Sequence, residues 1–147
     1  MAASGWQPLV KLEKLATKKG KKISNKKTVK ASSNAQVGKI VETITQTLSD
    51  LEDELNKLDA KVGDGDTGST FATGARDIQK ENKGKRLPLN NVADLLGVVG
   101  DRLATVMGGS SGVLMSIFFT AAGKKVGEGE KLPKALLSGL EGMKHYG

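Results

Sequence analysis

The feature that most constrains the fold of this 147-residue chain is the helical spacing of its apolar residues. From Val37 to Leu58 they recur at intervals of mostly three and four positions, which places them on one face of an α-helix. No segment alternates polar and apolar residues as a half-buried strand does. The sequence therefore predicts an all-α chain.

Glycine-rich and polar segments divide the chain into about five expected helices. These cover residues 35–58, 69–79, 91–107 and 112–125, and a fifth helix begins near Pro133, a residue suited to a first helical turn. The helix of residues 112–125 is apolar almost all round, so we expect it to be central. The expected folded domain covers residues 35–147.

Positive charge is concentrated before the first expected helix. The net charge is +7, yet residues 1–30 hold nine lysines and one glutamate, so the remainder is close to neutral. We expect residues 1–34 to be a disordered Lys-rich tail. The run Lys18–Lys22 also fits a nuclear address or a weak polyanion contact. With five aromatic residues in the chain, the sequence does not favour a nucleic-acid partner.

Composition excludes several other classes. The chain has no cysteine and one histidine, which excludes disulfides, thiolate chemistry and histidine-rich metal sites. It has no apolar stretch near the roughly 20 residues that span a bilayer, and no export or import signal. We therefore expect a cytoplasmic protein without a membrane partner.

A glycine-rich loop at residues 63–68 is crowded with carboxylates. Asp59, Asp64 and Asp66 fall within eight positions, and they would repel one another unless a cation lay among them. Hard oxygen donors suit Mg²⁺ or Ca²⁺. An EF-hand is excluded because Gly68, Ser69 and Ala75 occupy the positions of its required residues. The alternative is that the three aspartates are turn formers and helix caps.

A second glycine-rich segment, residues 108–112, precedes the apolar helix. Unhindered backbone N–H groups, the hydroxyls of Ser110 and Ser111, and the positive end of a helix together suit a phosphate. The segment lacks the lysine of a P-loop, and no strand precedes it. An ordinary helix–helix turn is the alternative. Taken together, an aspartate-held Mg²⁺ and an amide-held phosphate indicate a metal–nucleotide site.

Two strings carry a family resemblance. LDAKVGDGDTGSTFATGARDI (residues 58–78) and VMGGSSGVLMSIFFTAAG (residues 106–123) closely resemble the nucleotide-binding L domain, also called Dak2, of dihydroxyacetone (glycerone) kinases. The resemblance implies a barrel of eight antiparallel helices that binds ATP with Mg²⁺. It implies Asp59, Asp64 and Asp66 as metal ligands. The ATP-binding residues it implies are Thr67, Gly68, Ser69, Thr70, Gly109, Ser110, Ser111 and Gly112.

The resemblance also implies a function and a limit. The family transfers the ATP γ-phosphate to dihydroxyacetone held by a separate K domain, so no catalytic nucleophile or base is expected in this chain. The sequence predicts about five helices, whereas the family domain has eight, so we expect an incomplete barrel. We interpret the chain as a fragment of a kinase that is inactive alone. The donor stays open between free ATP and a permanently bound ADP, as in phosphotransferase-coupled systems. The alternative is a non-catalytic module that self-associates through exposed apolar helix faces.

Overall fold

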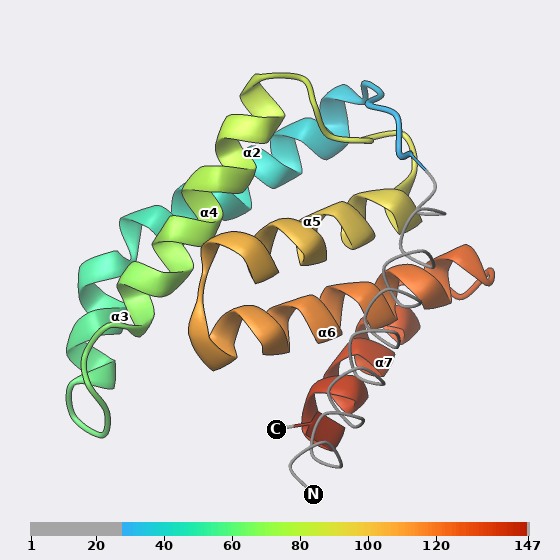
Figure 1. The fold of residues 1–147 in the computed structure, drawn as a ribbon. Coiled ribbons are helices and arrows are strands. Elements are labelled where there is room, and N and C mark those ends of the chain that lie inside the picture. The colour runs from blue at the N-terminus through green and yellow to red at the C-terminus, as the bar shows by residue number, and fades with distance from the viewer. Residues whose placement is uncertain (1–27, 147) are drawn as a thin grey trace, which may run out of the picture.

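The computed structural model describes residues 28–146, which form six α-helices (Figure 1). The helices are α2 (Ala35–Asp50), α3 (Glu52–Asp59), α4 (Thr67–Lys83), α5 (Val92–Val106), α6 (Gly109–Gly127) and α7 (Leu132–Tyr146). Within the described range the only β pairing is an isolated bridge between Ser32 and Pro88. The all-α prediction is confirmed.

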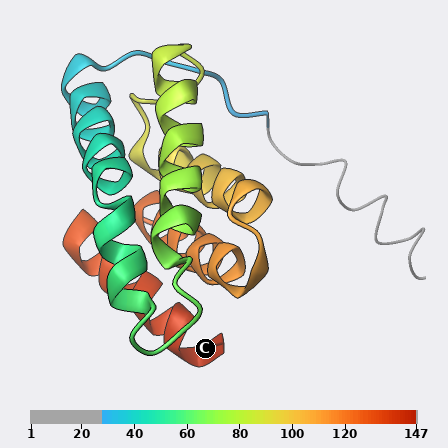
Figure 2. The ribbon, with the colours of Figure 1, turned by 90° about the vertical axis from the view of Figure 1, so that its left-hand side faces the viewer.

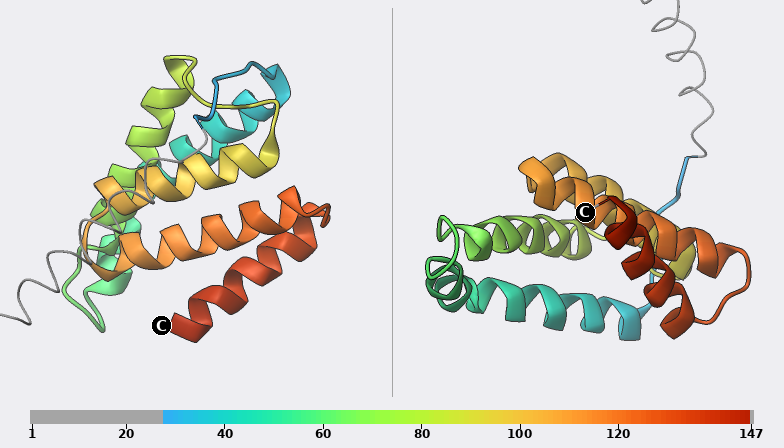
Figure 3. Two further views of the ribbon diagram at one scale, coloured as in Figure 1. Left: turned by 45° about the vertical axis from the view of Figure 1, so that its right-hand side comes forward. Right: turned by 90° about the horizontal axis from the view of Figure 1, so that it is seen from below.

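Each helix packs on a helix one or two places away along the chain. Helices α2 and α3 lie on α4, α4 contacts α5, α5 lies along α6, and α6 packs on α7. Figure 2 shows α2 and α4 side by side, with the loop that follows α3 at one end of the pair. Seen from below in Figure 3, α4 lies between α2 on one side and α5 and α6 on the other. The result is an open row of helices with α2 and α7 at its two ends.

The first expected helix is two helices, so the described residues hold six rather than about five. The break is at Leu51, where φ is −85° and ψ is 3°. Before it, Thr43, Thr45, Thr47 and Ser49 each donate a hydroxyl hydrogen bond to the carbonyl four residues earlier. Such bonds bend helices. The bend keeps the helical phase, which is why the apolar spacing of the sequence did not reveal it.

The residues just before α2 are held by the connection between α4 and α5. The N–H of Ser32 donates to the carbonyl of Leu87, and the N–H of Leu89 donates to the carbonyl of Ser32. The side chain of Asn34 then caps α2 by accepting from the N–H of Val37 at 3.2 Å. Residues 32–34 thus contact the α4–α5 connection and cap α2, whereas residues 1–27, which hold most of the expected Lys-rich tail, lie outside the described residues.

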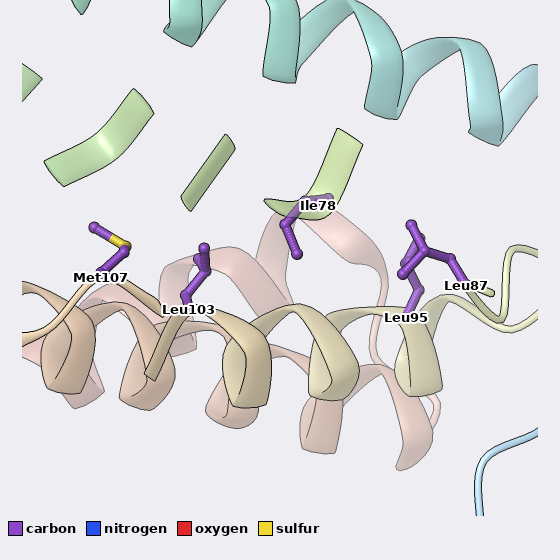
Figure 4. Packing of buried hydrophobic residues seen from close by; sticks show 5 residues of the cluster. All are labelled: Ile78, Leu87, Leu95, Leu103 and Met107. Carbon is purple, nitrogen blue, oxygen red and sulfur yellow. The ribbon is translucent and has the colours of Figure 1, made fainter. Parts of the chain in front are cut away.

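The buried apolar cluster lies between α4 and α5. Ile78, Leu87, Leu95, Leu103 and Met107 form one buried cluster, shown in Figure 4. Leu87 belongs to the connection between the two helices and is 1% exposed. Small residues bring the neighbouring helices close. A Cβ on Gly139 of α7 would lie 2.7 Å from the carbonyl oxygen of Phe118 in α6. The core thus fixes α4 to α5, and with them the loops at their ends.

An apolar cleft of about 420 Å³ remains on the inner side of the row. Side chains from α2, α4, α5, α6 and α7 line it, among them Ile40, Ile44, Phe71, Val99, Met115 and Leu136. Val37 and Val41 of α2 pack on the core, whereas Ile40 and Ile44 are 58% and 55% exposed, so part of the apolar face of α2 is uncovered within the described residues. Helix α6, expected to be central, lies between α5 and α7 with its large side chains half-buried. Among residues 28–146, no helix has the length and apolar character needed to span a membrane.

Replacing Leu87 by Ala should test the importance of the α4–α5 core. The change removes a fully buried side chain and leaves a cavity, which typically costs about 2–5 kcal/mol of unfolding free energy. Urea unfolding followed by circular dichroism measures it. The matched variant Leu137→Ala removes a side chain that is 61% exposed, and it should change stability by less than about 0.5 kcal/mol. Equal losses in both variants would show that the core lies elsewhere.

Candidate metal and nucleotide site

Asp59, the last residue of α3, organises the loop that leads into α4. One oxygen of its carboxylate, Oδ2, accepts the backbone N–H groups of Gly65, Asp66 and Thr67 at 3.0, 3.1 and 3.2 Å. Gly65 adopts φ +80°, a conformation that suits glycine and lets the chain turn back toward Asp59. The N–H of Thr67, its hydroxyl, and the N–H groups of Asp66 and Gly65 hold the pKa of Asp59 below its ordinary value. Asp59 is therefore a carboxylate anion fixed in place.

The other two aspartates meet Asp59 at the loop. Asp59, Asp64 and Asp66 each offer a carboxylate oxygen, and the three oxygens lie within 4.8 Å of one another. Asp64 and Asp66 are exposed, whereas Asp59 is half-buried. A hydrogen bond with Asp64 and the repulsion of that carboxylate raise the pKa of Asp66 above its ordinary value, with a smaller contribution from Asp59. The structure thus brings together the three residues that the sequence singled out.

This donor set fits a hard divalent cation. Mg²⁺ and Ca²⁺ prefer carboxylate oxygens, and three of them converge here from one short loop and the end of a helix. Carboxylates that lie this close repel one another when all are ionised. A cation among them would remove that repulsion. Asp59 would contribute a ligand whose position its backbone partners already fix.

Residues 67–70, the implied ATP contacts beside the aspartates, form the first turn of α4 rather than a loop before it. The N–H of Thr67 is bonded to Asp59, and both the N–H and the hydroxyl of Thr70 donate to the carbonyl of Asp66. The N–H of Ser69 donates to Asn56. Most donors of this turn are therefore bonded within the protein.

A contact between α3 and α4 that sequence reasoning missed supports this turn. The side-chain amide of Asn56 donates from Nδ2 to Ser69 Oγ at 2.9 Å and accepts at Oδ1 from the Ser69 N–H at 3.0 Å. Next to it, Glu52 pairs with Arg76 at 2.5 Å. Hydrogen bonds from Arg76 and from the Ser69 hydroxyl lower the pKa of Glu52. Apolar spacing carries no signal for such a contact, because Asn56 lies off the apolar stripe.

The second glycine-rich segment is also mostly helical. Helix α6 begins at Gly109, so the predicted loop at residues 108–112 is the first turn of a helix, and Gly108 is its N-cap. Gly108 and Gly109 have φ +68° and +56°, and open space surrounds both. No side chain caps this helix. The first N–H groups of a helix have no intrahelical partner, so this exposed end can bind an anion.

Both segments lie at the same end of the molecule. Gly74, seven residues after the start of α4, packs so closely on α5 that a Cβ there would lie 2.8 Å from Leu103 and 3.0 Å from Met107. Met107 directly precedes the start of the α6 segment. Seven residues of helix span about 10 Å. Figures 1 and 3 show the loop after α3 and the α5–α6 connection on one side of the molecule.

Comparison with known proteins identifies relatives of the folded part. The DAK2 domain family matches residues 61–147. Dihydroxyacetone kinase of Citrobacter freundii is 62% identical over 116 residues, which are 79% of this chain and 21% of that protein. Human triokinase/FMN cyclase is 39% identical over 119 residues, 79% of this chain and 20% of that protein. The chain therefore spans about a fifth of the length of these curated relatives.

A solved structure repeats the helical arrangement. The crystal structure of dihydroxyacetone kinase from C. freundii in complex with AMP-PNP and Mg²⁺ matches with a TM-score of 0.80 at 58% sequence identity. The match covers 83% of this chain and 23% of that one. The native form of the same enzyme matches with a TM-score of 0.79. This chain is therefore similar to that enzyme in sequence as well as in fold.

Gly68 provides a test of the α3–α4 contact. A Cβ at Gly68 would collide with the carbonyl of Glu52 and lie 2.9 Å from the backbone nitrogen of Asn56. Gly68→Ala should therefore push α4 off α3, lower the melting temperature and weaken divalent-cation binding. The control is Gly97→Ala on α5, where nothing lies within 4 Å and alanine should stabilise the helix by about 0.5–1 kcal/mol. Thermal unfolding and calorimetric Mg²⁺ titration measure both effects, and a neutral Gly68→Ala variant would contradict the close contact.

Proposed function

This chain belongs to the DAK2 domain family, and we propose on that premise that it is the ATP-binding portion of a dihydroxyacetone (glycerone) kinase. In this role it delivers the γ-phosphoryl group of ATP to dihydroxyacetone held by a separate K domain. The observation that carries the proposal is the convergence of the Asp59, Asp64 and Asp66 carboxylates beside the start of α4. The relative solved with AMP-PNP and Mg²⁺ supports the same pair of ligands here.

The three carboxylates would hold Mg²⁺ through one oxygen each. When bound, the cation neutralises negative charge on the nucleotide phosphates and on the transferring group. Asp59 keeps its Oδ2 for the loop, which leaves Oδ1 as its ligand atom. Asp64 and Asp66 face solvent and can meet the nucleotide from the open side.

The start of α6 is the proposed phosphate contact. Gly109 and Ser110 offer backbone N–H groups at a helix N-terminus, and Ser110 and Ser111 add hydroxyls. The N–H of Gly112 already donates to the carbonyl of Gly108 at 3.2 Å, so Gly112 contributes a close backbone approach rather than a donor. In the other segment, Thr67, Gly68, Ser69 and Thr70 lie beside the metal ligands, but most of their donors are bonded within the protein. We therefore assign the main phosphate contacts to α6 and a framing role to residues 67–70.

The chemistry proposed is an in-line transfer. A hydroxyl oxygen of dihydroxyacetone attacks the γ-phosphorus, the bond to the β-phosphate oxygen breaks, and ADP leaves. The hydroxyl proton goes to a base of the K domain or to water, because the proposed role of this chain is to position the phosphates. Fixed N–H groups at α6 stabilise charge without reorganisation during the step. The phosphoryl donor is either free ATP or a bound ADP that is rephosphorylated in place.

The apolar cleft favours a second candidate function. Ile40 and Ile44 of α2 are exposed, and apolar surface of this kind promotes association. A chain that self-associates through this face, or binds nucleotide without catalysing transfer, is the alternative. The two functions differ in a single assay, the formation of dihydroxyacetone phosphate with an added K domain.

Removing one carboxylate should abolish most metal-dependent nucleotide binding. Asp64→Asn replaces a charged ligand, and the loss of Mg-AMP-PNP affinity should exceed the roughly 10- to 100-fold cost of losing an outer-shell partner. Glu141→Gln removes an exposed charge on α7 that lies 3.7 Å from Lys144, and it should leave affinity unchanged. Isothermal calorimetry with matched circular dichroism spectra measures both. Unchanged affinity in Asp64→Asn would contradict the metal assignment.

The chain alone should not phosphorylate dihydroxyacetone. Its role is to bind the phosphoryl donor, and a reacting hydroxyl must be held within about 3–3.5 Å of the phosphorus for attack. Adding the K domain of a dihydroxyacetone kinase should restore product formation, which a coupled enzyme assay detects. Turnover by the chain alone at the ordinary enzyme rate of about 1–10³ s⁻¹ would contradict the division of labour. If the chain binds Mg-AMP-PNP but shows no turnover with or without the K domain, the non-catalytic module is favoured.

A further inference from the structure

We propose that Asn56 is a positioning residue for the metal site. Its amide fixes the first turn of α4 against α3 and thereby sets the spacing of the three carboxylates. This inference rests on the proposed function, because it concerns how the same site keeps its geometry. In this proposal Asn56 itself touches neither the cation nor the nucleotide. It acts through its hydrogen bonds to Ser69, which hold the first turn of α4 in place.

The placement of the contact is symmetric about the metal loop. Asn56 lies three residues before Asp59 on α3, and Ser69 lies three residues after Asp66 on α4. Three residues are nearly one helical turn, so Asn56 lies about one turn before Asp59 and Ser69 lies about one turn after Asp66. The two hydrogen bonds, at 2.9 and 3.0 Å, therefore join the two arms of the loop at matching points.

An amide suits this position because it must donate and accept at once. Oδ1 receives the Ser69 N–H, an N–H near the helix terminus, while Nδ2 donates to Ser69 Oγ. Glu52, whose pKa is lowered by Arg76 and by the Ser69 hydroxyl, is paired with Arg76. An aspartate in place of Asn56 would supply acceptors alone and would add a carboxylate near the other three.

The packing beneath the contact leaves little freedom. Gly68 is buried against the backbone of α3, so the turn that carries Ser69 lies directly on that helix. If the Asn56 bonds are lost, this turn can move away from α3. The N–H groups of Gly65, Asp66 and Thr67 then no longer converge on Asp59. The cation would lose a pre-formed arrangement of ligands.

The chain offers a matched control at the other end of the same helix. Asn82 of α4 donates from Nδ2 to the carbonyl of Gly38 in α2 at 2.9 Å, and it is likewise half-buried. Asn56→Ala and Asn82→Ala each remove an amide that ties α4 to a neighbouring helix. Any general loss of stability should be shared by both variants, whereas a loss of site geometry should be confined to Asn56→Ala.

The experiment uses two measurements on the full chain. Calorimetric titration with Mg²⁺ should show about a tenfold weaker affinity in Asn56→Ala and no more than a twofold change in Asn82→Ala. Hydrogen exchange followed by NMR without metal should show faster exchange at Gly65, Asp66 and Thr67 in Asn56→Ala alone. Ser69→Ala keeps the backbone N–H bond to Asn56, so its effect on Mg²⁺ affinity should be smaller than that of Asn56→Ala. Adding Asn56→Ala to Ser69→Ala should lower the affinity further only by the contribution of that remaining bond.

The outcomes separate this inference from the proposed function. Unchanged affinity and unchanged amide protection in Asn56→Ala overturn the positioning role, while the function stands if Asp64→Asn still loses binding. Equal loss in Asn56→Ala and Asn82→Ala also overturns it, because the effect is then general stability. If the parent chain binds no Mg²⁺, the proposed function fails, and the exchange measurement still decides whether Asn56 orders the loop.

Discussion

The site depends on one carboxylate that holds its own loop. Asp59 Oδ2 accepts three consecutive backbone N–H groups, and this joins the end of α3 to the start of α4. Without those bonds, seven residues between the helices would have no common partner, and Asp64 and Asp66 would have no fixed place. In the proposed site Asp59 therefore has two roles, in which one oxygen orders the backbone and the other is the metal ligand. In the proposed site, metal binding and the structure of the loop therefore depend on the same residue.

The sequence predicted what depends on residue type and spacing. Helical periodicity identified the helices because an apolar stripe must face a neighbour, and the three aspartates were recognised because crowded carboxylates demand a cation. The break at Leu51 was not predicted because a bend leaves the stripe of apolar residues continuous. The start of α6 at Gly109 escaped because glycines favour a loop reading, although two of them at positive φ here form the entry of a helix.

Contacts between helices were the part that spacing could not predict. Asn56 and Ser69 are 13 residues apart and polar, so nothing in the local pattern links them. Ser32 and Leu87 join segments more than fifty residues apart through backbone groups that carry no side-chain signal. The family resemblance implied Asp59, Asp64 and Asp66 as metal ligands, and the structure adds the hydrogen bonds that fix Asp59 in place. The identity of residues 67–70 as a framing turn follows from their hydrogen bonds rather than from their sequence.

The order of the helices has a consequence for how the molecule assembles. Each helix packs on a helix one or two places away along the chain, so the early contacts close short loops and cost little chain entropy. The proposed cation site, with its supporting pair Glu52 and Arg76, is encoded by one contiguous stretch of 25 residues, 52–76. As the chain leaves the ribosome, this stretch can reach its native contacts before α6 and α7 exist. Under the proposed function, the nascent chain acquires its magnesium ion before the proposed phosphate contact at α6 is synthesised.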